Sequence, residues 1–150
     1  IGKSDKKMQE LIRKKISYFT KNSLVQIIFD ATFIDRRKMK SIFAQSDIVL
    51  IPYKNIESSS GVLGHAISSG KPVIGPANGL LGALISQYQL GYLIKEITPK
   101  SLSGIIAESF NNSIIINSEA YKKGRSSDDF CSIIMKILLS DKPVSLCTDI

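Results

Sequence analysis

The sequence predicts an α/β fold in which a parallel β-sheet is covered by helices on both faces. Segments with helical spacing alternate along the chain with short apolar runs, and these runs lack the alternating polar positions of a half-exposed strand. Residues 46–76 read as strand, polar loop, helix, turn and strand. A unit of this kind produces parallel strands joined by a right-handed crossover, which is the basis of the prediction.

Basic helices flank an apolar run in the first third of the chain. Ser4 or Asp5 can cap the first helix, whose apolar residues follow a period of 3.6. Residues 24–29, LVQIIF, read as a strand, and Asp35 caps a second helix after a loop at 30–34. The residues expected to face inward from these helices are Met8, Leu11, Ile12, Ile16, Phe19, Met39, Ile42 and Phe43.

The central unit supplies the first candidate site. Residues 47–51 form an apolar run that is too short for a helix, and Pro52 ends it. A polar loop at 54–60 leads into a helix at 61–69, and residues 70–72 stop that helix before the next strand begins. Ligands in such folds bind outside the carboxyl ends of the strands. The loop at 54–60 therefore becomes the expected binding segment.

The remainder of the chain continues the alternation of helix and strand. The predicted elements are a turn at 78–79, a helix at 80–89, a strand at 91–94, a helix that begins at Pro99 with Thr98 as its cap, a short helix at 118–123, a last helix capped by Ser126 or Ser127, and a tail at 140–150. The residues expected to face inward are Leu81, Leu84, Ile85, Leu102, Ile105, Ile106, Phe110, Phe130, Ile133, Ile134, Ile137 and Leu138.

Basic residues are concentrated in the first two predicted helices of this 150-residue chain, whose formal net charge is +7. Solvated helix faces are one interpretation of this charge, and attraction to anionic lipid or to a phosphorylated ligand is the other. Nucleic acid is not expected as a partner, because no aromatic residues interleave with the basic runs.

The cysteines and the hydropathy pattern favour a cytoplasmic protein. Cys131 and Cys147 have neither the spacing of a disulfide framework nor that of a metal site. No signal peptide and no apolar run of about 18 residues is visible, so any membrane association is expected to be peripheral, at the inner face of the membrane. The chain begins with Ile1-Gly2-Lys3, like the end of a strand, and is expected to be a piece of a longer one.

Several short motifs follow one another in an order that resembles that of a known protein family. The motifs are Pro52-Tyr53 at the end of a strand, then Glu57, then Ser60-Gly61-Val62, then Ala66, then Gly70-Lys71-Pro72-Val73-Ile74, and downstream Gly79, Leu90-Gly91-Tyr92-Leu93-Ile94 and Thr98-Pro99. Their order and spacing resemble the carboxy-terminal domain of B-type (GT-B) glycosyltransferases, most closely family 4. The resemblance covers roughly residues 1–138.

The resemblance implies a Rossmann-like, doubly wound parallel sheet that forms the carboxy-terminal half of a GT-B fold. Residues 1–139 would be a nucleotide-sugar-binding domain truncated at its start, and 140–150 a tail. In the family this domain binds the nucleotide-sugar donor, while an amino-terminal domain carries the acceptor site. By that comparison, the acceptor domain is missing, as are the first strand and helix of the donor domain with the Arg and Lys that usually grip the diphosphate.

The resemblance also assigns residues to the donor site. Ser59, Ser60, Gly61 and Val62 would present backbone N–H groups to the donor phosphates at a helix amino terminus, although a plain serine-capped helix explains the same residues. Metal is not required in this picture, and no cofactor other than the donor substrate is expected.

Two further positions are assigned by the same comparison. Glu57 matches the first Glu of the family's Glu-x₇-Glu pattern and becomes the catalytic candidate, where it would accept hydrogen bonds from sugar hydroxyls and steady positive charge at the anomeric carbon. The second Glu is replaced by His65, which is either a weaker ribose contact or a packed helix residue. Phe33 and Ile34 resemble the segment that meets the base, or pack on the core instead.

The leading hypothesis is therefore a glycosyltransferase of polysaccharide biosynthesis. It would transfer a sugar from a nucleotide-sugar donor to a glycan, lipid or protein acceptor, with this chain as the donor-binding part and inactive alone. The alternative is a non-catalytic Rossmann-like module that binds a nucleotide or a partner protein. An epimerase of the same architecture would need acid and base residues that the sequence does not display.

Overall fold

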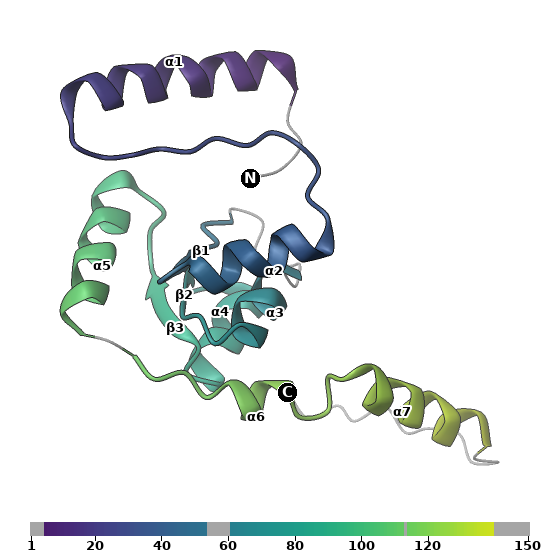
Figure 1. Ribbon diagram of the computed structural model, residues 1–150. Coiled ribbons are helices and arrows are strands. Elements are labelled where there is room, and N and C mark those ends of the chain that lie inside the picture. Colours follow the sequence, from purple (N-terminus) through teal and green to yellow (C-terminus); the bar gives the residue numbers. More distant parts are fainter. Residues whose placement is uncertain (1–4, 54–60, 113, 140–150) are drawn as a thin grey trace. The chain divides into compact units, whose positions relative to one another are not determined.

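The computed structural model describes residues 5–53, 61–112 and 114–139. The chain divides into two compact units, residues 1–42 and residues 43–150, and each is described by itself. The second unit contains a three-stranded parallel sheet of order β1-β2-β3 with helices before, between and after the strands (Figure 1). The expected α/β class with a parallel sheet is confirmed.

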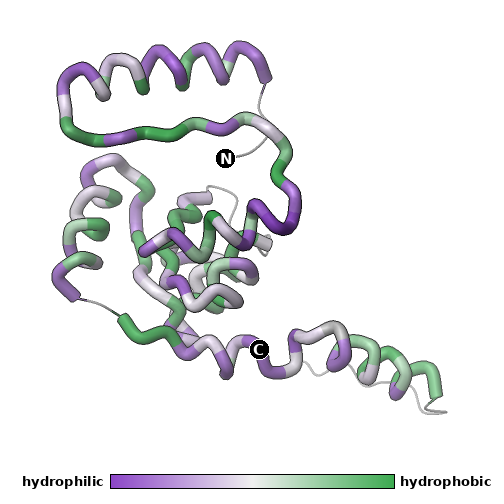
Figure 2. Tube along the Cα trace, in the orientation of Figure 1, coloured by the Kyte–Doolittle hydropathy of each residue, from purple (hydrophilic) through white to green (hydrophobic). Residues whose placement is uncertain are grey.

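The first unit begins with helix α1, Lys6–Asn22. The backbone N–H of Met8 donates to Oδ1 of Asp5 at 2.8 Å, which confirms Asp5 as the cap. No residue of α1 is buried. Ile12 and Ile16 are half-buried, but Met8, Leu11 and Phe19 are about half exposed, so their predicted burial is wrong for the described residues. The helix keeps an apolar stripe among its lysines (Figure 2).

The predicted strand at 24–29 is the main error in element assignment. The structure contains no strand there, and Leu24, Val25 and Ile28 are exposed by 60% or more. A strand exists only when its backbone pairs with a neighbour. The described strands pair only with one another, so this segment has no ladder to join. Within it, the ring of Phe29 is instead covered by the guanidinium of Arg13 at 5.6 Å.

The sheet of the second unit consists of β1 (Val49–Leu50), β2 (Val73–Pro76) and β3 (Gly91–Ile94). The strand expected at 47–51 is shorter than predicted, although the N–H of Ile51 still donates to the carbonyl of Ile74 at 2.9 Å. All pairs are parallel, with Val49 opposite Val73 and Ile74 opposite Tyr92. The carboxyl ends of the three strands therefore lie at one edge of the sheet.

Helices cover both faces of this sheet. On one face, α3 (Gly61–Ser68) and α4 (Gly79–Gln87) bury one apolar cluster, whose fully buried members are Ile51, Leu63, Ala66, Ile67, Val73, Leu81, Ile85 and Leu90. On the other face, Ile74, Tyr92 and Ile94 pack against half-buried residues of α5 (Pro99–Asn111) (Figure 1). Successive residues Val73 and Ile74 belong to opposite clusters, as the pleat of a strand requires.

The predicted helix boundaries in the second unit are largely confirmed. Thr98 accepts a hydrogen bond from the N–H of Ser101 at 3.1 Å, and Pro99 occupies the first turn of α5. Gly70, at φ +69°, ends the α3 segment in the left-handed region that favours glycine. Helix α6 spans Ser118–Lys122 and helix α7 spans Ser127–Leu139.

Inward packing of the last helix is not observed. The predicted inward residues of α7 are all exposed, by 38% at Ile134 and by 72% at Leu138, and Phe110 of α5 is 74% exposed. A helical period shows only that a helix has an apolar side, and burial also needs a surface to receive it. No described residue buries the apolar side of α7, which appears as a largely hydrophobic tube in Figure 2.

Asp35 caps α2, Arg36–Gln45, by accepting from the N–H of Lys38 at 2.8 Å, as predicted. The three residues expected to face inward from α2, namely Met39, Ile42 and Phe43, are half-buried.

Candidate ligand groove along helix α3

Helix α3 begins where the chain returns from the carboxyl edge of the sheet. Its first residue is Gly61, which follows the predicted binding loop. Glu57, Ser59 and Ser60 lie outside the described residues, so the structure does not test the roles assigned to them. The candidate site is built here from Gly61 onward.

The sequence of α3 divides the helix into a buried side and an open side. Leu63, Ala66 and Ile67 are fully buried against the sheet, and Val62 is half-buried against the same cluster. The other side carries Gly61, Gly64, His65 and Ser68. A methyl group added at Gly61 or Gly64 would meet no described atom of another element within 4 Å, so the helix backbone is uncovered at these two positions, between the side chains of His65 and Ser68 and the start of the helix.

An open groove of about 670 Å³ runs along this side of the helix. Its lining residues come from α3 and from the segment around α6: Gly61, Gly64, His65, Ser68, Tyr121, Lys122, Arg125 and Ser126. Two predicted donor-site residues, Gly61 and His65, thus line the same groove, while Val62 lies beside it without lining it. The volume is within the range of about 300–1,000 Å³ that is usual for small-molecule sites.

His65 packs against a neighbouring ring and also lines the groove. Its imidazole stacks on the ring of Phe43, with centroids 5.9 Å apart and planes 28° apart, so the ring is supported from one side. The residue is nevertheless exposed and lines the groove. The ribose-contact role stays a prediction.

The opposite wall of the groove is basic and is held by aromatic rings. Tyr121 packs partly on the core cluster and meets the ring of Tyr88 edge-on at 5.7 Å. The guanidinium of Arg125 lies over both rings, 5.0 Å from Tyr88 and 4.8 Å from Tyr121. Such cation–π contacts are worth about 0.5–1 kcal/mol each at exposed sites. They fix the position of a cation that would otherwise move freely.

Hydrogen bonds add to this positioning. Nη1 of Arg125 donates to the carbonyl of Tyr121 at 3.0 Å and to the hydroxyl of Tyr88 at 3.4 Å. Next along the chain, Ser126 and Asp129 cap α7 reciprocally, since the hydroxyl of Ser126 donates to Oδ2 at 2.6 Å and accepts from the N–H of Asp129 at 3.0 Å. The hydrogen bonds from Ser126, first from its hydroxyl and then from its N–H, hold the pKa of Asp129 below its ordinary value.

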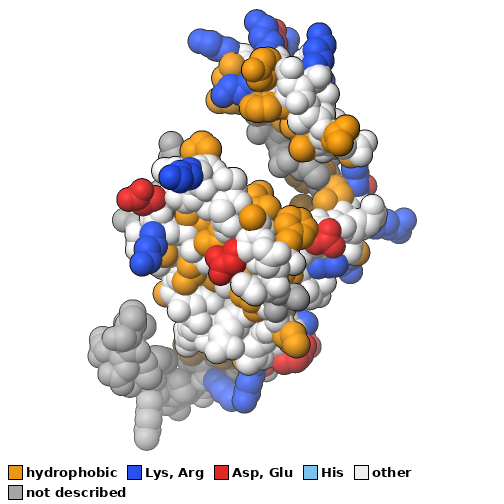
Figure 3. Space-filling model, turned by 90° about the vertical axis from the view of Figure 1, so that its left-hand side faces the viewer, with side chains coloured by type: hydrophobic (Ala, Val, Ile, Leu, Met, Phe, Trp, Pro, Cys, Tyr) orange, Lys and Arg blue, Asp and Glu red, His pale blue; other side chains and the backbone are white. Residues whose placement is uncertain are grey.

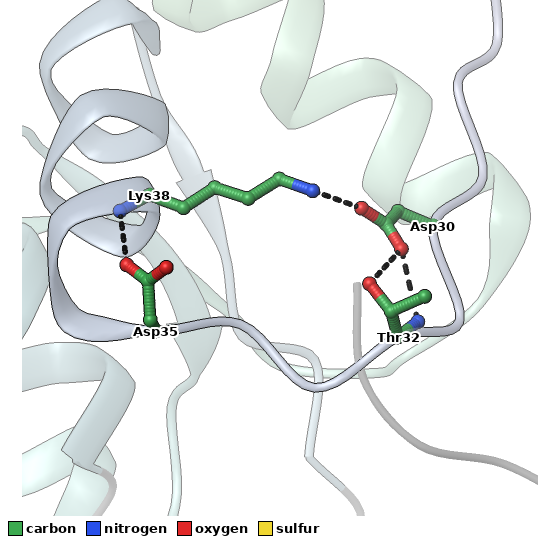
Figure 4. Close-up of polar contacts among 4 residues, drawn as sticks. All are labelled: Asp30, Thr32, Asp35 and Lys38. Atoms are coloured by element: carbon green, nitrogen blue, oxygen red, sulfur yellow. Dashed lines mark hydrogen bonds and ion pairs between the residues drawn. The ribbon is translucent and has the colours of Figure 1, made fainter.

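Phe33 and Ile34 belong to the first unit and stand on a locally braced loop. Asp30 accepts from the N–H and hydroxyl of Thr32 and from Nζ of Lys38, the last at 2.6 Å (Figure 4). These bonds, with that of Lys38 the largest, hold the pKa of Asp30 well below its usual range. Phe33 is 91% exposed and Ile34 is half-buried. Packing of Phe33 on a core is therefore not seen among the described residues.

A second cavity, of about 280 Å³, is mainly apolar and lies at the other end of the sheet. Asp47, Ile48 and Pro72, which line it, precede strands β1 and β2 and so mark the amino edge. The hydroxyl of Tyr92, at its wall, donates to the carbonyl of Asn112. The groove along α3 fits the expected position of a ligand better, because it includes the helix terminus at the carboxyl edge.

Sequence reasoning missed most of the groove. No binding role was predicted for Ser68, Tyr121, Lys122, Arg125 or Ser126, because they follow the predicted loop by 8 to 66 positions along the chain. The only local signal is the basic cluster Lys122-Lys123-Gly124-Arg125. Which of these cations reaches α3 depends on how α6 packs against the core.

Comparison of the sequence with models of known protein families gives no match, and comparison with curated proteins gives no significant match. Over residues 5–53, 61–112 and 114–139, no helix is long and apolar enough to cross a membrane. In the same residues, no three or more His, Cys, Asp or Glu side chains gather as metal ligands would.

Proposed function

We propose that the chain is the donor-binding part of a family 4-like GT-B glycosyltransferase, which transfers a sugar from a nucleotide-sugar to a glycan, lipid or protein acceptor. The observation that carries the proposal is the groove in which Gly61 and His65 lie together at the start of α3. Gly61 belongs to the motifs that resemble the family, His65 occupies the position of the family's second Glu, and α3 begins at the edge where ligands of parallel sheets bind.

The architecture supports this proposal at a coarser level. A parallel sheet covered on both faces, with a helix beginning beyond the first strand, is compatible with a Rossmann-like fold. The doubly wound topology and the GT-B assignment are part of the proposal. In this scheme the sheet continues into strands that precede β1 in the whole enzyme.

The chemistry assigned to the site needs no metal. Backbone N–H groups at the start of α3 bind the donor phosphates, helped by the helix dipole. Gly61 permits close approach of the ligand, and His65 contacts the ribose. Glu57, in the adjoining loop, binds the transferring sugar and stabilises charge that develops at its anomeric carbon. The acceptor is held by a domain outside this chain, at the cytoplasmic face of a membrane.

Calorimetric titration with UDP- and GDP-sugars tests the donor site. We expect the wild-type chain to bind at least one of these donors, and Glu57→Ala to weaken binding by about tenfold, the effect of one hydrogen-bonded charged group. Glu96→Ala is the matched control, because Glu96 is an exposed acid beyond the end of β3 that does not line the groove. If a demonstrably folded chain binds no nucleotide-sugar, the donor-site proposal is wrong.

A non-catalytic binding module is the second candidate, and His65 favours it. A carboxylate can accept two ribose hydrogen bonds side by side, whereas an imidazole makes only one with each nitrogen. His65→Glu distinguishes the candidates: tighter binding of a nucleotide-sugar supports a donor site, while unchanged or weaker binding with retained affinity for a nucleotide supports the module.

A further inference from the structure

We propose that the groove between α3 and α6 is a diphosphate site in which Lys122 and Arg125 are the phosphate-binding cations. The inference rests on the proposed function only for the identity of the ligand, a nucleoside diphosphate or its sugar. The residues themselves indicate the diphosphate chemistry.

The charge of the lining is the first argument. Lys122 and Arg125 line the groove, and no acid is among the described residues that line it. Of the carboxylates beside these residues, Asp129 is held by Ser126, and Glu119 pairs with Lys122 itself. Ser68 and Tyr121 also line the groove and carry hydroxyl groups, whereas the hydroxyl of Ser126 is taken up by Asp129. Such a lining attracts an anion and can hydrogen-bond several of its oxygens.

The preorganisation of Arg125 is the second argument. The rings of Tyr88 and Tyr121 hold its guanidinium, and among the described residues Nη1 is the nitrogen that donates hydrogen bonds. Nε and Nη2 remain for a ligand. A planar fork fixed in this way matches two oxygens of a phosphate group and loses little side-chain entropy when it binds.

Lys122 supplies a second positive charge beside the fixed guanidinium of Arg125, and its side chain can move. Its Nζ lies 3.1 Å from Oε1 of Glu119, but the two side chains are 41% and 86% exposed. Ion pairs this exposed contribute little to stability. Lys122 can therefore leave Glu119 for a phosphate oxygen without loss of an important contact.

The open side of α3 is an independent argument. Gly64 lies inside the helix, where glycine is unfavourable relative to alanine, whereas Gly61 is only the first residue of α3. Gly64 has no positive φ that would require glycine, and no described neighbour crowds it. Packing and conformation thus leave Gly64 unexplained. A ligand that lies directly against the helix backbone explains it.

The test uses inorganic pyrophosphate, UDP, inorganic phosphate and uridine as separate probes in calorimetric titrations. We expect pyrophosphate and UDP to bind, phosphate to bind more weakly and uridine weakest of all. Arg125→Gln and Lys122→Gln should each weaken pyrophosphate binding by about tenfold. Lys123→Gln is the matched control, because it removes the same charge from the adjacent residue, which does not line the groove.

Gly64→Leu separates binding from folding. Leucine is a better helix former than glycine, so thermal unfolding should move to a higher temperature, while the side chain fills the groove and abolishes pyrophosphate binding. Pyrophosphate binding that Gly64→Leu leaves intact, or that Lys122→Gln and Lys123→Gln weaken equally, overturns the proposal.

The outcomes also separate this inference from the proposed function. Binding of pyrophosphate that depends on Lys122, with no affinity for any nucleotide-sugar, supports the diphosphate site and contradicts the donor site. Nucleotide-sugar binding that depends on Glu57 but is unchanged in Lys122→Gln and Arg125→Gln contradicts the diphosphate site alone.

Discussion

At the scale of single residues, close contacts with the backbone determine which positions accept only glycine. Gly91 begins β3 with φ +153°, and a Cβ there would lie 2.0 Å from the carbonyl oxygen of Val73. The strands can pair this closely only because the side chain is missing. The sequence predicts a strand at 91–94, but only the register of the sheet shows that Gly91 lies opposite Val73.

Gly91→Ala should lower the free energy of unfolding by about 2 kcal/mol or more, because strain at this φ and a backbone collision act together. Urea denaturation followed by circular dichroism measures the change. Gly104→Ala is the control, since its Cβ would meet nothing within 4 Å in α5, and it should stabilise the chain by about 0.5–1 kcal/mol. Equal effects at the two positions would contradict the crowding argument.

Asp30 is the residue whose ionisation is most strongly coupled to local structure. Because Lys38 and Thr32 lower its pKa in the folded chain, it stabilises the loop fully above the unfolded value of about 3.9. That contribution disappears as the pH falls through the lower, folded value. The Thr32 amide, which donates to Asp30 at 2.9 Å, reports this titration by NMR.

We expect the Thr32 amide resonance to titrate with a midpoint below the ordinary Asp value of about 3.9. Lys38→Met should move the midpoint upward, since it removes the largest cause of the shift. Lys40 lies two residues along the same helix, and among the described residues the ion pair of Asp30 is with Lys38, so Lys40→Met should leave the midpoint unchanged. A midpoint insensitive to Lys38→Met would show that the ion pair does not form.

At the scale of elements, boundaries and caps were well predicted from the sequence, whereas burial was not. Asp5, Asp35, Thr98 and Ser126 accept the capping bonds that their residue types suggested. Capping depends on residues within three positions, so local sequence contains the information. The strand at 24–29 and the inward face of α7 needed partners far along the chain, and the pattern alone could not supply them.

Helix α1 makes an element-scale prediction about membranes. It has no buried residue, and its Met8, Leu11 and Phe19 are about half exposed. At the top of Figure 3, Lys and Arg side chains lie beside hydrophobic ones. Basic helices with an exposed apolar side bind anionic bilayer surfaces. We expect the chain to sediment with vesicles of phosphatidylserine and phosphatidylcholine, and not with phosphatidylcholine alone.

Two variants test this prediction: one places a charge on the apolar side of α1 and the other places it on the polar side. Leu11→Asp should reduce sedimentation with the anionic vesicles at least about fivefold, because it places a charge in the apolar stripe. Ser17→Asp introduces the same charge at an exposed polar position and should have a smaller effect. If the chain does not bind anionic vesicles, or if both variants bind equally well, α1 does not act as a membrane helix.

At the scale of the whole molecule, the described residues form a three-stranded sheet, and the proposed function places the cleft for transfer between this chain and an acceptor domain. If the proposed function is correct, the purified chain should bind a donor yet show no transfer of radiolabelled sugar to any acceptor. The full-length enzyme, tested beside it as the control, should be active. Robust turnover by the 150-residue chain would show that the acceptor domain is unnecessary.

The sequence by itself determined the class of fold, the order of the elements in the second unit, the caps, and the helix start at Gly61, because helical and strand patterns and caps depend on neighbours within a few residues. Only the tertiary structure decided that 24–29 is not a strand, that α7 buries nothing among the described residues, and that Lys122 and Arg125 reach the open side of α3. Each of these depends on contacts between distant segments, which a local pattern does not encode.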